Sequence, residues 1–214
     1  YATHTDSPDE WPQLMRDWTT LALAETDCVV CNVQSLANNK RNVVQWMSEF
    51  SGNLVDIVIW DKGHGAPQMQ RNVLTNSFEW IYILSPEPDA SRAIPLGDFH
   101  GTIENIVRIS AKGGNEFADV HRATMPIELA QWGVESIGPK AKTIVDPFGG
   151  TGTTLIAAEK SGKRAALIEM DPKYVDVIVK RWQEFTGKQA TLEATGATFA
   201  EVEADSSKAI AEEV

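Results

Sequence analysis

The sequence predicts a protein of the α/β class, with an open, mostly parallel sheet that carries helices on both faces. Three observations support this prediction. Short runs of β-branched residues alternate with longer segments whose apolar residues recur at helical spacing. A glycine-rich turn at residues 149–152 joins a predicted strand directly to a predicted helix. The chain has 214 residues, 43% of them apolar, which is enough for one hydrophobic core without disulfides or metal.

The first 84 residues contain the patterns of helices that alternate with strands. Residues 7–10, Ser-Pro-Asp-Glu, match a capping box with proline at the first helical position, so a helix is predicted to follow as far as residue 25. Trp11 and Trp18 belong to its apolar face. Residues 61–77 are expected to form a loop. The remaining patterns predict strands over 28–33, 54–60 and 78–84, and a helix over 42–50.

The rest of the chain begins with an interruption of this alternation. Residues 85–119 hold three prolines and four glycines, and only 102–109 has the pattern of a strand, so this section is predicted to be a small, loop-rich insertion. The acidic stretch after about residue 194 is expected to be a flexible tail. Between them the sequence predicts helices over 126–137, from the glycine turn to 162, and over 172–185, and strands over 143–145 and 164–168.

Charge and hydropathy limit the classes of function. The formal net charge is −11, to which the last 22 residues contribute −5 through six acids and one lysine. This balance argues against a nucleic-acid partner, because phosphate binding depends on lysine and arginine, although a local basic cleft can coexist with it. No stretch approaches the ~18 apolar residues of a membrane helix, and the first residues lack the pattern of a signal peptide. We therefore expect a soluble, cytoplasmic protein.

The cysteines and histidines do not predict a metal site. Cys28 and Cys31 are three residues apart in a predicted strand, so their side chains diverge. Two buried thiols in a reducing compartment are the expected state. The four histidines are dispersed along the chain, and we expect no metal.

The residues that point to chemistry lie between 143 and 171. A predicted strand ends at Asp146, the chain turns through 149–152, and a helix follows. Glycines at such a turn let the polar groups of a ligand approach the free N–H groups of the helix. The next strand ends at Glu169, 17 residues after Gly152, where a carboxylate can accept both hydroxyls of a ribose. These residues predict a cofactor that contains a nucleoside.

The spacing of the glycines narrows the choice of nucleoside. A phosphate-binding Walker loop needs a lysine after the glycines, and none follows here. A dinucleotide fingerprint that used Gly150 and Gly152 would need a third glycine at the position of Leu155. The remaining candidate is S-adenosylmethionine, which offers ribose hydroxyls to Glu169 and has no pyrophosphate. Asp146 suits the ammonium group of its methionine.

The same stretch resembles a known motif. D-P-F-G-G-T-G-T-T at 146–154, I-E-M-D at 168–171 and the following Tyr174 closely resemble the cofactor-binding motif of the amino-methylating DNA methyltransferases, and of their β class in particular. Two upstream segments are similar to this family as well, H-R-A-T-M-P-I-E-L at 121–129 and I-V-I-W-D-K at 57–62.

The resemblance covers nearly the whole chain to about residue 192 and implies a Rossmann-like, S-adenosylmethionine-dependent methyltransferase fold. It implies a catalytic half at 1–84, a target-recognition insertion at 85–119, a cofactor-binding half at 120–193 and an acidic, flexible tail at 194–214. The cofactor-binding residues that it implies are Asp146, Pro147, Phe148, Gly149, Gly150, Thr151, Gly152, Thr153, Thr154, Glu169, Met170, His121, Ala123 and Thr124.

The activity that the resemblance implies is methyl transfer from S-adenosylmethionine to the exocyclic amino group of adenine (N6) or cytosine (N4), in a base rotated out of a DNA duplex. The catalytic tetrapeptide of the family, Asp/Ser/Asn-Pro-Pro-Tyr, has no match in residues 2–214, and Tyr1 stands where its stacking aromatic residue would fall. A possible homodimer and a prokaryotic or phage origin are further expectations. The candidate contacts to DNA, some of which are expected to gather on the DNA side, are Lys62, Arg71, Arg92, Arg108 and Lys112.

Other functions remain open on the sequence alone. A nicotinamide-dependent oxidoreductase would share the fold and Glu169 but lacks the third glycine. An inactive or non-catalytic cofactor-binding remnant is compatible with the missing tetrapeptide. A methyltransferase that acts on RNA or a small molecule is a third alternative, less favoured because the chain order resembles that of the DNA enzymes.

Overall fold

The computed structural model describes residues 9–35, 38–65, 69, 71–89, 92–111 and 125–212, with the backbone alone over 206–212. The elements of the first part are α1 (Trp11–Glu25), β1 (Val29–Val33), α2 (Lys40–Glu49), the short 3-10 helix η1 (Ser51–Asn53), β2 (Leu54–Asp61), β3 (Phe78–Leu84) and β4 (Ile106–Arg108). Those of the second part are α3 (Ile127–Trp132), the π-helical turn η2 (Gly133–Ile137), β5 (Thr143–Asp146), α4 (Thr153–Lys160), β6 (Arg164–Leu167), α5 (Pro172–Thr186) and α6 (Phe199–Glu212).

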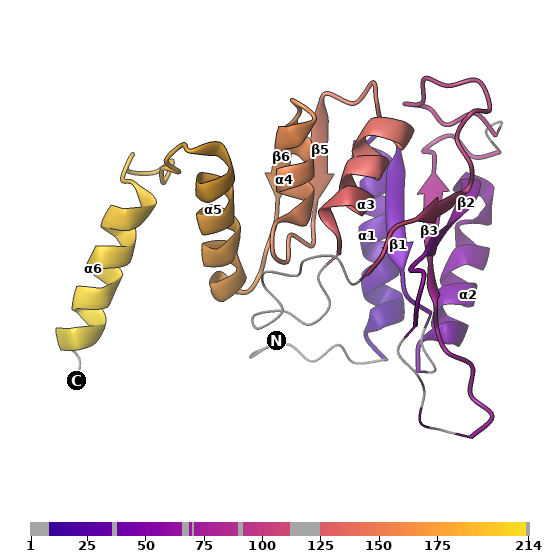
Figure 1. Cartoon of the computed structure of the whole chain (residues 1–214), viewed down its shortest axis with the longest axis horizontal. Coiled ribbons are helices and arrows are strands. Elements are labelled where there is room, and N and C mark those ends of the chain that lie inside the picture. Colours follow the sequence, from indigo (N-terminus) through magenta and orange to yellow (C-terminus); the bar gives the residue numbers. More distant parts are fainter. Residues whose placement is uncertain are drawn as a thin grey trace.

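The strands form two sheets in the described part of the chain. The larger has the order β1-β3-β2-β4, in which β3 is antiparallel to both of its neighbours and β4 is parallel to β2. The smaller consists of β5 and β6, which are parallel. Figure 1 shows the small sheet beside α4, with α5 and then α6 beyond it at one end of the molecule. The α/β class is confirmed, but the larger sheet is mixed rather than mostly parallel.

The reversed direction of β3 has a simple cause. A parallel neighbour requires a crossover connection, usually a helix, that returns the chain to the start of the sheet. None of the described residues between Asp61 and Phe78 is helical, so β3 starts at the edge where β2 ends and runs back beside it. The loop is predicted by the sequence, whereas the antiparallel pairing that follows from it is a finding of the structure.

Helices cover both faces of the larger sheet, as predicted. Successive residues of a strand point to opposite faces. On β3, Tyr82 and Leu84 accordingly pack with Met15 of α1 and Trp46 of α2. From the other face, Ile81 and Ile83 pack with Leu129 of α3 and Ile137 of η2, in a cluster that also contains Val58 of β2. The same α3 lies against α4, so it connects the two sheets.

Three boundaries differ from the predictions. Helix α1 begins at Trp11, after Glu10, with Pro12 in its first turn; Ser7 and Pro8 of the predicted capping box lie outside the described residues. The strand expected over 102–109 is reduced to β4, which is three residues long. The expected flexible tail contains α6, which is joined to α5 by an ion pair of 2.7 Å between Lys180 Nζ and Glu203 Oε1.

The buried tryptophan of α2 provides a test of how the first core is held. The indole N–H of Trp46 donates to Thr19 Oγ1 of α1 at 2.9 Å, and both side chains are almost fully buried. Thr19→Val keeps the volume and removes the acceptor, so we expect a loss of about 1–3 kcal/mol of unfolding free energy. Urea denaturation measures this loss. In a Trp46→Phe background the same substitution should cost much less, and an equal cost in both backgrounds would contradict the role of this bond.

Candidate functional site

The glycine turn lies where β5 ends and α4 begins, next to the end of β6. The backbone N–H of Gly149 donates to the carbonyl of Ile168 at 2.9 Å, and the N–H of Ile168 donates to the carbonyl of Asp146 at 2.9 Å. A Cβ at position 149 would come within 3.2 Å of both the Ile168 carbonyl and the Ile178 side chain of α5. Only glycine allows the turn to lie this close to its neighbours.

Two further glycines of the turn adopt left-handed backbone conformations. Gly150 has φ +52° and Gly152 has φ +78°. The N–H of Gly152 donates to the carbonyl of Gly149 at 2.8 Å, which closes a β-turn with a positive φ at its first central residue, as in type II′. Gly152 caps α4, and the first helical bond runs from Ile156 N to its carbonyl at 3.1 Å. The N–H groups that precede this bond have no helical acceptor, which favours an anionic or polar ligand at this end of α4.

Glu169 links the end of β6 to the turn. Its Oε2 accepts a hydrogen bond from the N–H of Gly150 at 2.7 Å, and its Oε1 accepts one from the N–H of Asp171 at 2.9 Å. The N–H of Gly150 is therefore directed to Glu169 and is not one of the groups offered to a ligand. Because each carboxylate oxygen can accept more than one hydrogen bond, the fixed carboxylate can still accept the two hydroxyls of a diol.

The other predicted residues near the turn differ in how far they are exposed to solvent. Asp146 is half-buried and its Oδ1 accepts from the N–H of Phe148 at 2.9 Å, while Phe148 and Met170 are exposed at 53% and 67%. Carboxylates beside exposed apolar side chains are typical of a ligand site. Thr151 and Thr153 instead point into the protein, each 5% exposed. Pro147 and Thr154 are half-buried.

Two contacts to this region were missed by the sequence analysis. Trp18 of α1, predicted only as helix core, lies against Phe148 with ring centroids 5.8 Å apart. Arg181 of α5 donates through Nη1 to the carbonyl of Thr151 at 3.0 Å. Arg181 follows Ile178 by three residues and so shares the helix face that packs on the turn. The sequence carries no signal for either contact, because each joins residues 30 or more positions apart.

Several predicted residues lie outside the described part of the chain. This applies to the predicted catalytic residue and to the upstream cofactor segment, and also to one predicted DNA contact. They are Tyr1, His121, Ala123, Thr124 and Lys112.

Lys62 does not have the exposed position predicted for a DNA contact. It is 8% exposed, and its Nζ lies 3.2 Å from Glu79 Oε1, whose side chain is also largely buried. The two residues meet because β2 and β3 pair with Trp60 opposite Glu79. A buried ammonium needs such a partner, since an unpaired charge is costly away from water. Lys62 therefore neutralises Glu79 inside the fold.

The three predicted arginines do not all lie on the same side. Arg108 ends β4 and pairs with Glu104 at 3.2 Å, and it lies opposite Asp61 at the end of β2. Arg92 lies 3.6 Å from Asp56 near the beginning of β2. Asp56 and Asp61 are five residues apart in an extended strand, a distance of roughly 17 Å. Arg92 therefore lies near the start of β2, at the opposite end of this strand from Arg108. Arg71 is exposed in the loop between β2 and β3.

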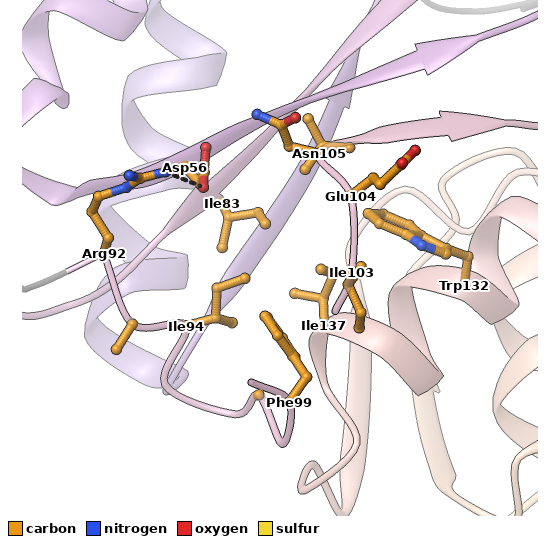
Figure 2. Close-up of a pocket in the computed structure, with 13 residues that line it drawn as sticks. Asp56, Ile83, Arg92, Ile94, Phe99, Ile103, Glu104, Asn105, Trp132 and Ile137 are labelled. Atoms are coloured by element: carbon orange, nitrogen blue, oxygen red, sulfur yellow. Dashed lines mark ion pairs between the residues drawn. The ribbon is translucent and has the colours of Figure 1, made fainter. Parts of the chain in front are cut away.

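The cavity beside Arg92 is separate from the glycine turn. Figure 2 shows Ile94 and Phe99 facing Ile83 of β3 and Ile137 across it, with the Arg92–Asp56 ion pair at its edge. Its volume is about 240 Å³. One side of it is formed by members of the apolar cluster between the sheet and α3, among them Val58, Ile83 and Ile137, so it borders the hydrophobic core of that face.

The cysteines carry no thiolate that could act as a nucleophile. Burial raises the pKa of Cys31 to about 12, and burial together with the charge of Asp27 raises the pKa of Cys28 to about 11. Both residues are half-buried free thiols, less enclosed than predicted. Among the described residues, no three histidine, cysteine or acidic side chains are arranged to hold a metal ion. None of the described helices is long and apolar enough to span a membrane.

Comparison with known proteins decides the family. The DNA methylase family matches residues 2–180, which is most of the chain and includes both strands of the site. The chain belongs to the DNA methylase family. Within it, the Type II methyltransferase M.Cfr9I of Citrobacter freundii is 26% identical over 129 residues, which cover 59% of this chain and 43% of that relative. The chain thus spans less than half the length of this DNA methylase.

Solved structures share the fold. The M1.HpyAVI–SAM complex has a TM-score of 0.63 at 17% identity, over 82% of this chain and 85% of that one. The PvuII DNA methyltransferase, described as cytosine-N4-specific, has a TM-score of 0.66 at 16% identity, over 87% of this chain and 80% of that one. The S-adenosylmethionine-dependent methyltransferase fold predicted from the motif is confirmed by these two structures.

The close contact between the turn and α5 can be tested with a matched pair of glycines. Gly152 and Gly162 both have positive φ, +78° and +65°, but a Cβ at 152 would lie 3.2 Å from Ile178 whereas one at 162 would meet nothing within 4 Å. We expect Gly162→Ala to cost about 1–2 kcal/mol of unfolding free energy from backbone strain alone. Gly152→Ala should cost clearly more in the same urea titration. Equal losses would show that Ile178 does not constrain the turn.

Proposed function

We propose that this chain is the cofactor-binding part, with much of the catalytic part, of an S-adenosylmethionine-dependent DNA methyltransferase. The methyl acceptor is the exocyclic amino group of adenine or cytosine. The observation that carries the proposal is the Glu169 carboxylate, fixed across the glycine turn by the N–H groups of Gly150 and Asp171. Membership of the DNA methylase family supports it.

The donor and acceptor groups of the site fit S-adenosylmethionine. Glu169 would accept the ribose hydroxyls, and Asp146, at the end of β5, would pair with the ammonium of the methionine. The N–H groups at the start of α4 suit its carboxylate. Phe148 and Met170 offer exposed apolar surface beside these polar groups. The cofactor supplies an electrophilic methyl group on a sulfonium, and this chain binds and orients it.

A dinucleotide fits the same site less well. A pyrophosphate would need the backbone N–H groups of the glycine turn, but that of Gly150 already donates to an anion, Glu169. Leu155 stands where the third glycine of the dinucleotide fingerprint would be. An oxidoreductase is also disfavoured by the family match, which extends well beyond the motif.

DNA is the substrate that the family and its Type II relatives suggest. Two exposed arginines, Arg71 and Arg108, lie toward the edge where β2 and β4 end, and they are our candidates for phosphate contacts. Extrusion of the target base, its stacking on Tyr1, a recognition role for 85–119 and self-association are further parts of the proposal. They come from the resemblance of the sequence to the amino-methylating enzymes.

Cofactor binding tests the central role of Glu169. Isothermal titration of this chain should show binding of S-adenosylmethionine and no comparable binding of NADH. Glu169→Gln should weaken binding at least about tenfold, because it removes a charged acceptor for the ribose hydroxyls. Glu193→Gln, which removes one negative charge from a distant exposed turn, is the control and should bind like the wild type. Melting curves establish that each variant is folded. Tight binding of NADH in place of S-adenosylmethionine would refute the assignment.

Methyl transfer tests the substrate. The chain, with and without Asp-Pro-Pro, Ser-Pro-Pro or Asn-Pro-Pro added before Tyr1, is incubated with unmethylated DNA and methyl-labelled S-adenosylmethionine. We expect the label in N6-methyladenine or N4-methylcytosine after digestion to nucleosides, and none with Glu169→Gln. Label in 5-methylcytosine would contradict the proposed acceptor. Binding of the cofactor without transfer by either form would favour a non-catalytic remnant.

A further inference from the structure

The glycine turn is supported from within the protein by one face of α5. Ile178 lies beneath the turn, so close that a Cβ on Gly152 would be 3.2 Å from two of its side-chain carbons. One turn later, Nη1 of Arg181 donates to the Thr151 carbonyl at 3.0 Å, Thr153 Oγ1 at 3.2 Å and Thr151 Oγ1 at 3.4 Å. A single guanidinium nitrogen therefore contacts both threonines of the turn.

These contacts fall on the peptide unit between Thr151 and Gly152, whose N–H closes the β-turn to the Gly149 carbonyl at 2.8 Å. The flanking Gly150 and Gly152 both have positive φ, which glycine adopts about as readily as negative φ. The β-turn bond holds the N–H side of this peptide, and Arg181 holds its carbonyl side. A carbonyl that is held toward Arg181 on the protein side cannot turn toward the ligand side. It would otherwise place a negative dipole among the N–H groups at the start of α4.

Contacts other than those of Arg181 also hold α5 in place. The indole N–H of Trp182, the next residue, donates to Glu159 Oε1 of α4 at 2.9 Å. Ile178 is 9% exposed and packs under the turn. These contacts attach α5 to α4 independently of the guanidinium. Its loss should therefore affect the geometry of the turn more than the docking of the helix.

We propose that Arg181 is a positioning residue for cofactor binding, which acts through Thr151 and Thr153 to hold the glycine turn in its binding conformation. The proposal rests on the function proposed above, because it takes the turn to be the site of S-adenosylmethionine. It adds a residue from a helix 30 positions beyond the turn, outside the glycine motif and on the side away from the ligand. Arg181 touches the turn and not the reacting atoms.

The experiment compares three substitutions on α5 in the full chain. Arg181→Met removes the donor and keeps the length of the side chain, and Arg181→Lys keeps a charged donor. Lys180→Met is the matched control, since it removes a positive charge from the adjacent exposed residue, whose partner is Glu203 on α6. Titration calorimetry measures S-adenosylmethionine affinity. Hydrogen exchange of the unliganded protein measures the opening of residues 149–154, and thermal melting measures overall stability.

We expect Arg181→Met to weaken binding about tenfold or more and to accelerate exchange in the turn, with melting close to that of the wild type. Arg181→Lys should recover most of the affinity, to within about threefold of the wild type, because a charged amine can replace the Nη1 donor to the turn. Lys180→Met should match the wild type in all three measurements. A purely structural role would lower melting and leave no selective effect on the turn.

Each contrary outcome has a distinct meaning. If the wild-type chain binds S-adenosylmethionine and Arg181→Met binds it with the same affinity, the positioning role is overturned and the proposed function stays intact. Failure of the wild-type chain to bind S-adenosylmethionine would overturn both. If Arg181→Met does not fold, Arg181→Ala, which also removes the donor, takes its place in the comparison. A loss of affinity of about tenfold with unchanged melting then supports the role, and affinity equal to that of the wild type refutes it.

Discussion

The hydrogen bond between the Glu169 carboxylate and the backbone N–H of Gly150 is the interaction on which the site depends. It joins the end of one strand to the turn that follows its neighbour, at 2.7 Å. The second bond, from the N–H of Asp171 to the other oxygen, fixes the orientation of the carboxylate. Because the group is held by the backbone on both sides, it needs no reorganisation to accept a diol. Preorganisation of this kind reduces the cost of ordering a site when a ligand binds.

The close packing of the turn gives this bond its geometry. Gly149 lies against the Ile168 carbonyl, and Gly152 against Ile178 of α5. The strand ends, the turn and the helix behind it therefore form one unit, in which glycine provides the space and α5 provides the support. The α3 helix connects this unit to the larger sheet, through its packing in the core and its contact with α4.

Those parts of the fold that depend on local pattern could be predicted from the sequence. The β-branched run of β2 and the apolar periodicity of α5 give strong signals, and both elements lie within two residues of their predicted bounds. The glycine spacing and Glu169 predicted a nucleoside site because they are fixed by the chemistry of one short segment. The buried state of Lys62 could not be predicted, since it depends on the pairing register that places Glu79 next to it. The same holds for Trp18, whose contact with Phe148 joins distant segments.

The position of α6 changes the meaning of the acidic net charge. Figure 1 places α6 at one end of the long axis, beyond α5, whereas β2 and its arginine-bearing neighbour β4 belong to the other end. Among the acids counted in the total, Glu201, Glu203 and Asp205 belong to α6. At physiological ionic strength the Debye length is about 8 Å, so mobile counterions attenuate the field of such remote charges before it reaches the opposite end. A polyanion that approaches there encounters the local potential rather than the sum over the chain. At very low ionic strength the electrostatic field of the acids on α6 extends further and would repel a polyanion that approaches the opposite end. For most proteins that bind nucleic acid, low ionic strength instead strengthens the attraction.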